Sequence, residues 1–119
     1  MSSFLDPYLK KLGLYFKEFL DKEPRVRAHI MVKGRVFEGS YHVYAEQQAR
    51  NYGLKGWLKV RDGLSANAFL ELEVEAPDPT MQNFIMDLRK GNRDSHVTLV
   101  TVEMRPVGRP PFSGFSRLL

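Results

Sequence analysis

Residues 68–91 read AFLELEVEAPDPTMQNFIMDLRKG and hold the clearest pattern in the chain. The first half alternates apolar with acidic residues, which is typical of a strand with one buried face. Asp78-Pro79 then predicts a helix start, because aspartate is a good N-cap and proline suits the first helical position. Apolar residues at helical spacing follow up to Gly91, at Met81, Phe84, Ile85 and Leu88.

A second strand-helix pair precedes this one. Residues 25–33 alternate apolar with polar side chains, and a glycine-rich turn leads to a predicted helix at 41–52. Short strands are expected at 55–60 and 96–104. The order is strand, helix, strand, strand, helix, strand, which predicts an α+β, ferredoxin-like (βαββαβ) two-layer sandwich with both helices on one face of the sheet.

Several side chains can be assigned to the two faces of this sandwich. We expect Trp57 in the core, and a packing role for the tyrosines of the first helix, Tyr41, Tyr44 and Tyr52. In a ferredoxin-like sheet the first and third strands are neighbours. Basic residues of one would therefore face acidic residues of the other on the uncovered side, which predicts a solvated ion-pair face in place of a metal site; the residues are Arg25, Arg27, His29, Glu71, Glu73 and Glu75.

Composition excludes several classes of protein. The chain has 119 residues, no cysteine and three widely separated histidines, which predicts one domain with no metal site and no cofactor. No apolar run is long enough to span a membrane, so we expect a cytoplasmic protein. The net charge is +4, and residues 105–119 carry three arginines and no acidic residue. The rest of the chain lacks the basic face of a nucleic-acid-binding protein, so no nucleic acid partner is expected.

The two ends lie outside the predicted sandwich at 25–104. Residues 1–24 predict an amphipathic helical arm whose apolar side would contact a protein partner or a second copy of the chain. The residues of that side are Leu5, Tyr8, Leu9, Leu12, Phe16, Phe19 and Leu20. Residues 105–119 form a basic, proline-rich C-terminal tail, which we expect to order against a partner or against its own domain.

Four pieces of the sequence resemble the acylphosphatase family: HIMVKGRV, ARNYGLKGW, RDG and DLRKG, within residues 26–104. The resemblance implies a loop whose backbone N–H groups hold the phosphate of an acyl phosphate. It also implies an arginine at the end of that loop that binds the phosphate, and an asparagine soon after the tryptophan that positions the attacking water. The candidates for this anion loop are Gly34, Arg35, Glu38, Gly39, Ser40, Tyr41 and His42.

The sequence departs from the family pattern at both side chains. His42 occupies the arginine position and Val60 the asparagine position. Histidine lacks the permanent charge and planar fork of arginine, valine cannot orient water, and Glu38 adds a negative charge to the loop. We therefore expect no catalytic residues and a protein-binding or assembly module. The alternative is an active acylphosphatase with a rearranged site in which His42 and loop amides hold the phosphate.

Overall fold

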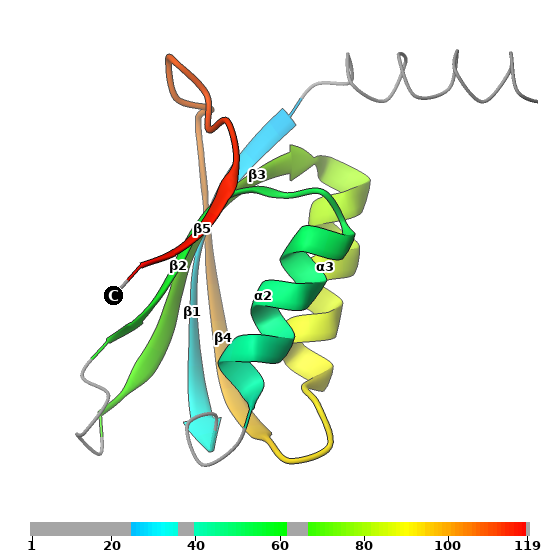
Figure 1. Ribbon diagram of the computed structural model, residues 1–119, viewed down its shortest axis with the longest axis vertical. Helices are drawn as coiled ribbons and strands as arrows, with labels where there is room; N and C mark the ends of the chain where they lie inside the picture. Colours follow the sequence, from blue (N-terminus) through cyan, green and yellow to red (C-terminus); the bar gives the residue numbers. More distant parts are fainter. Residues whose placement is uncertain (1–24, 36–39, 62–66, 119) are drawn as a thin grey trace, which may run out of the picture.

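The computed structural model describes residues 25–35, 40–61 and 67–118 (Figure 1). The order of elements is β1 (Arg25–Arg35), α2 (Tyr41–Asn51), β2 (Lys55–Arg61), β3 (Phe69–Pro77), α3 (Asp78–Lys90), β4 (His96–Arg105) and β5 (Phe115–Leu118). The first six correspond to the predicted sandwich, and β5 was not predicted. The N-terminal arm and the contact predicted for its apolar side lie outside the described residues, so both stay predictions.

The strands form one mixed sheet in the order β4-β1-β3-β2-β5. β1 pairs antiparallel with β3 and β4, β2 pairs antiparallel with β3, and β5 lies parallel to β2. Both helices cover the same face of the sheet (Figure 1). This confirms the α+β sandwich and is consistent with the ferredoxin-like order.

The core lies between the helices and this face of the sheet. Its fully buried apolar side chains come from alternate positions of β1, β2 and β3 and from one side of each helix. The largest are Tyr41, Phe84, Ile30, Leu54, Leu58, Leu70, Leu72, Met81 and Leu88. Because the period of a strand is two, the intervening residues point to the other face of the sheet, which we call the open face.

The tyrosines of α2 pack and also make hydrogen bonds to α3. Tyr41 is buried and its hydroxyl donates to the carbonyl of Leu88 at 2.7 Å. Tyr52 donates to Oδ2 of Asp87, also at 2.7 Å. Burial raises the pKa of Tyr41 far above its ordinary range, so its hydroxyl stays protonated and keeps this bond. The packing role predicted for these tyrosines is confirmed.

Two local predictions are wrong. Asp78 is the first residue of α3 and not its N-cap; Pro77 caps the helix in an extended conformation, and the carboxylate of Asp78 accepts from Gln82 within the first turn. Trp57 is half-buried on the open face and not in the core. Register explains this second difference, because Trp57 pairs with Glu73, whereas its buried neighbour Leu58 faces the helices.

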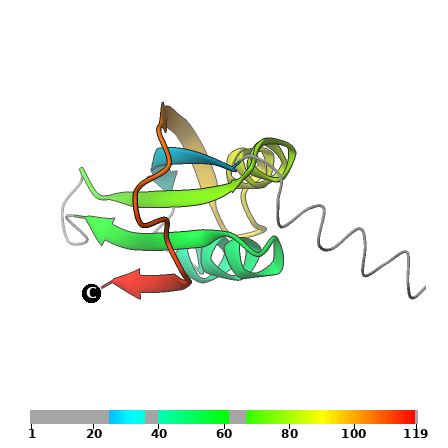
Figure 2. The same cartoon turned by 90° about the horizontal axis from the view of Figure 1, so that it is seen from above.

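The open face holds the predicted ion pairs but is not solvated throughout. The carboxylate of Glu75 is fully buried and accepts from Arg27 Nε at 3.0 Å and from the backbone N–H of Phe112 at 2.6 Å. The guanidinium of Arg27 lies 3.9 Å from the centre of the Phe112 ring. The segment between β4 and β5 thus crosses β3 and covers part of this face (Figure 2).

One ion pair of this face makes the stability depend on pH. Glu71 Oε2 lies 2.6 Å from His29 Nε2, and Arg61 Nε donates to Oε1 at 2.6 Å. Burial alone would raise the pKa of Glu71, but the hydrogen bonds to His29 and Arg61 outweigh burial and lower the pKa below its ordinary value of 4.5. A carboxylate with a lowered pKa in the folded state stabilises the fold above its unfolded pKa, and this contribution is lost as the pH falls through the folded value.

We therefore expect Glu71→Gln to cost about 1 kcal/mol of unfolding free energy at pH 7. The cost should shrink below pH 4.5 and vanish once Glu71 is protonated in the folded wild type. Urea unfolding at a series of pH values measures it. Glu103→Gln is the control, because that side chain is 65% exposed. A cost for Glu71→Gln that is the same at pH 7 and pH 3 would contradict the assignment.

Candidate active site

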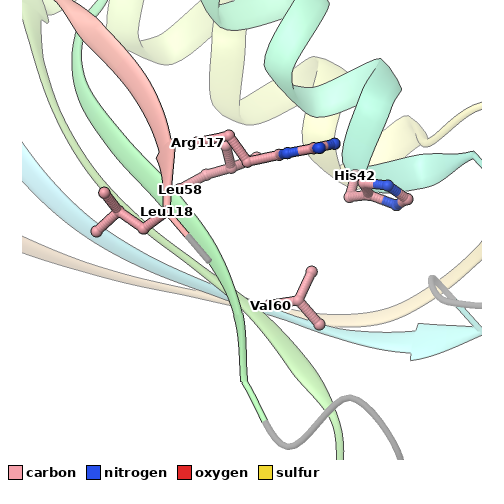
Figure 3. A pocket seen from close by; sticks show the side chains of 5 residues that line it. All are labelled: His42, Leu58, Val60, Arg117 and Leu118. Atoms are coloured by element: carbon pink, nitrogen blue, oxygen red, sulfur yellow. The ribbon is translucent and has the colours of Figure 1, made fainter.

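A pocket of about 260 Å³ opens where the start of α2 approaches β2 and β5 (Figure 3). It is lined by His42, Leu58, Val60, Arg117 and Leu118. Val60 lies on the helix side of β2 because it pairs with the buried Leu70 of β3. The two positions that the family resemblance assigns to arginine and asparagine, His42 and Val60, therefore line one pocket.

The N-terminus of α2 carries backbone N–H groups that the helix itself does not pair. The first hydrogen bond closed by the helix runs from the N–H of Tyr44 to the carbonyl of Ser40 at 2.9 Å. The N–H groups of residues 41–43 consequently have no acceptor within the helix. The N-cap residue Ser40 makes no side-chain cap, and no acidic residue lies in the first turn. This helix end favours an anion, through both its N–H groups and its dipole.

The structure describes only some of the predicted anion-loop residues. Gly34 and Arg35 end β1, with an irregular register beside Gly34. Glu38 and Gly39 lie outside the described residues. Ser40 occupies the N-cap position of α2, and its Oγ accepts from Nδ2 of Asn92 at 3.2 Å. Among the loop candidates that the structure describes, His42, which is half-buried, is the one that lines the pocket.

Arg117 also lines the pocket and was missed by sequence reasoning. It lies on β5, opposite Leu58 of β2, and its side chain extends toward the start of α2 (Figure 3). Its Nε lies 4.0 Å from Oε1 of Glu46. Residues 115–118 have no apolar-polar alternation that would have indicated a strand, and the adjacent prolines and glycines favoured a tail.

The acylphosphatase family model matches residues 28–116. The chain belongs to the acylphosphatase family. This match runs past β4 into β5, so a part of the predicted tail lies within the region shared with other acylphosphatases.

Individual acylphosphatases agree with this assignment. The chain is 34% identical to an acylphosphatase of Bifidobacterium longum over 83 residues, which are 69% of this chain and 80% of that protein. It is 31% identical to an acylphosphatase of Bacillus velezensis over 75 residues, or 63% of this chain and 79% of that protein. The crystal structure of an acylphosphatase from Bacillus subtilis superposes with a TM-score of 0.70 at 26% identity and covers 79% of this chain and 99% of that one.

These findings correct the function predicted from the sequence. A protein-binding or assembly module that has lost acyl phosphate hydrolysis is contradicted by the family match and by relatives named acylphosphatase at about 30% identity. The prediction was wrong because it judged the site from positions 38, 42 and 60 and did not include the C-terminal strand. Two of the five residues that line the pocket, Arg117 and Leu118, lie on β5.

In the part of the chain that the structure describes, we find neither a membrane-spanning helix nor a metal-binding cluster. Neither α2 nor α3 has the length and apolar composition needed to cross a bilayer. Across residues 25–35, 40–61 and 67–118, no group of three His, Cys, Asp or Glu side chains is placed to hold a metal ion.

Proposed function

We propose that the chain is an active acylphosphatase, which hydrolyses acyl phosphates to a carboxylate and inorganic phosphate. The observation that carries the proposal is the family match over residues 28–116. The pocket at the start of α2 supports it, because an acyl phosphate is an anion and this helix end presents N–H groups without intrahelical acceptors.

The reaction suits a site with few functional side chains. The oxygen of water bonds to phosphorus, the bond between phosphorus and the acyl oxygen breaks, and the carboxylate leaves with the bonding electrons. A carboxylic acid has a pKa near 4, so the leaving group needs no proton from a general acid. The proton lost by the attacking water passes to the phosphate product or to solvent. Catalysis then rests on orienting the phosphoryl group and stabilising its charge.

Both backbone and side-chain groups of the described residues can orient the phosphoryl group and stabilise its charge. The N–H groups of residues 41–43 are the donors for the phosphoryl oxygens, and His42 adds a ring N–H at the same end of the helix. Val60 and Leu58 make the β2 side of the pocket apolar. An apolar wall strengthens the electrostatic interactions of a bound phosphoryl group by excluding water from that side.

An added negative charge at the start of α2 tests whether the reaction takes place there. We expect His42→Glu to lower kcat/KM for benzoyl phosphate by about tenfold or more, because a carboxylate at the start of α2 repels the phosphoryl group. The matched control is Gln47→Glu, which adds the same charge to an exposed position of the same helix. Its rate should stay within about twofold of wild type. Equal rates for wild type and both variants would place the reaction elsewhere.

A further inference from the structure

We propose that Arg117 supplies, from β5, the phosphate-binding cation that the start of α2 lacks. The inference rests on the proposed function. The family pattern places the phosphate-binding arginine at position 42, on α2. The proposal places that positive charge on β5 instead. Four observations support it: the register of β5, the position of the guanidinium, the placement of the other cations, and the contacts that hold β5.

The register fixes the side of the sheet to which Arg117 points. β5 runs parallel to β2, with Phe115 opposite Gly56 and Arg117 opposite Leu58. Leu58 is fully buried under the helices, and Phe115 packs against the same core. Phe115 and Arg117 are two residues apart on a strand, so they share the helix face. The backbone therefore directs Arg117 toward α2 and away from the open face.

The guanidinium reaches the first turns of α2. Arg117 and His42 line the same pocket, and Figure 3 shows the Arg117 side chain extending toward the helix end that carries His42. The contact with Glu46 agrees with this, because Glu46 lies one helical turn after His42 and its Oε1 is 4.0 Å from Nε of Arg117. Arg117 is thus close to the N–H groups that the proposed function assigns to the phosphoryl group.

Three other cations near this end of the sheet, Lys33, Lys59 and Arg61, are directed elsewhere. The period of β2 places Lys59 and Arg61 on the open face, where Arg61 donates to Glu71 at 2.6 Å. On β1, Lys33 is exposed, with its Nζ 6.0 Å from the centre of the Phe69 ring. Among the five residues that line the pocket, Arg117 is the one with a permanent charge.

Glu46 lies near Arg117 but does not occupy the N–H donors of the Arg117 Nη groups. Its carboxylate already accepts from Arg50 Nη2 at 3.3 Å, and its contact with Arg117 involves Nε alone, at 4.0 Å. Among the described residues, no other carboxylate pairs with Arg117. Its two Nη groups can therefore bind two oxygens of one phosphate, a pairing that the planar fork of arginine matches. A phosphoryl dianion attracts the guanidinium more strongly than a single, partly exposed carboxylate does.

The strand that carries Arg117 is held at its start. The N–H of Gly56 donates to the carbonyl of Gly114 at 2.7 Å, directly before β5 begins. The guanidinium of Arg50 lies 5.5 Å from the centre of the Phe115 ring. These contacts fix Arg117 relative to α2 before substrate binds, and such preorganisation lowers the ordering cost of binding.

The test compares Arg117→Met with Arg105→Met. Arg105 is a matched control because its side chain is about as exposed as that of Arg117, 41% against 47%. It differs in its place, because it pairs with carboxylates on the open face. Arg117→Met should lower kcat/KM for benzoyl phosphate on the order of 10- to 100-fold and weaken binding of inorganic phosphate by a similar factor. Arg105→Met should leave both within about twofold. Melting temperatures of both variants report their folding.

A rescue separates charge donation from a structural role. Adding His42→Arg to Arg117→Met returns a guanidinium to the pocket from α2, so it should recover at least about tenfold of the lost kcat/KM. A residue that only held β5 in place would not be replaced in this way. Arg117→Lys, which keeps the charge but not the fork, should fall between wild type and Arg117→Met.

The possible failures are distinct. An active wild type whose kcat/KM and phosphate affinity are unchanged in Arg117→Met would overturn the role of Arg117 and leave the proposed function intact. A wild type without activity would overturn the proposed function. The phosphate titration, followed by the backbone amide signals of residues 41–43, would then decide on Arg117 alone: weaker binding in Arg117→Met supports its assignment, and equal or absent binding overturns it.

Discussion

Gly56→Ala is expected to lower the free energy of unfolding by about 4 kcal/mol, because the backbone at this position excludes a side chain. Gly56 has a φ of +140°, a conformation that residues with a Cβ rarely adopt. A Cβ built here would lie 2.0 Å from the carbonyl oxygen of Glu73 on β3. β2 and β3 would have to move apart at this point, and β2 is the strand that places Leu58 and Val60 beside the pocket.

Gly53→Ala is the matched control for this change. Gly53 has a φ of +71°, but a Cβ there would meet no atom within 4 Å. We expect it to cost about 1 kcal/mol, from backbone conformation alone. Urea unfolding of the wild type and both variants measures the difference. Equal costs for the two substitutions would contradict the close approach of β2 and β3 at Gly56.

Glu75→Ala is expected to cost about 3–5 kcal/mol, because it takes the nearest carboxylate away from the largely buried guanidinium of Arg27 and leaves only Glu73, at 3.9 Å. Glu75 is fully buried on β3 and accepts from Arg27, Gly108 and Phe112. Its loss also removes the hydrogen bonds from the backbone N–H groups of Gly108 and Phe112, which hold the segment leading to β5. We therefore expect faster amide hydrogen exchange at Gly108 and Phe112, together with lower acyl phosphate hydrolysis.

The control for this prediction is Glu103→Ala. Glu103 lies on β4 with its side chain 65% exposed, and its carboxylate pairs with Arg105 Nη2 at 3.5 Å. An exposed pair of this kind contributes less than about 1 kcal/mol. If Glu75→Ala and Glu103→Ala unfold at the same urea concentration, Glu75 is not the anchor of the segment between β4 and β5.

Much of the sandwich could be predicted because its strands and helices carry strong periodic patterns. The alternation of residues 68–76 corresponds to β3, and the helical stripe that follows corresponds to α3. Topology and charge predicted that the basic residues of β1 face the acidic residues of β3, and the structure pairs Arg27 with Glu75. Trp57 was misplaced because aromatic character favours burial, whereas its face is set by the register of β2 against β3.

The site could be predicted only in part, because it joins residues that are far apart in the chain. His42 was found from the family pattern at the start of α2. Arg117 lies on the four-residue strand β5, which is too short to show a strand period and follows prolines and glycines that favour a tail. Its pairing with β2 depends on the N–H of Gly56 meeting the carbonyl of Gly114, a contact between distant segments.

The most direct test of the account is the rate at which the full wild-type chain hydrolyses benzoyl phosphate, compared with p-nitrophenyl phosphate at the same protein concentration. The account predicts release of benzoate and phosphate in proportion to protein, with kcat on the order of 1 to 10³ per second and competitive inhibition by inorganic phosphate. It predicts slower hydrolysis of the phosphomonoester, because p-nitrophenolate is more basic than benzoate and is therefore the poorer leaving group. A benzoyl phosphate rate no higher than buffer alone, from protein with a cooperative melting transition, would contradict it.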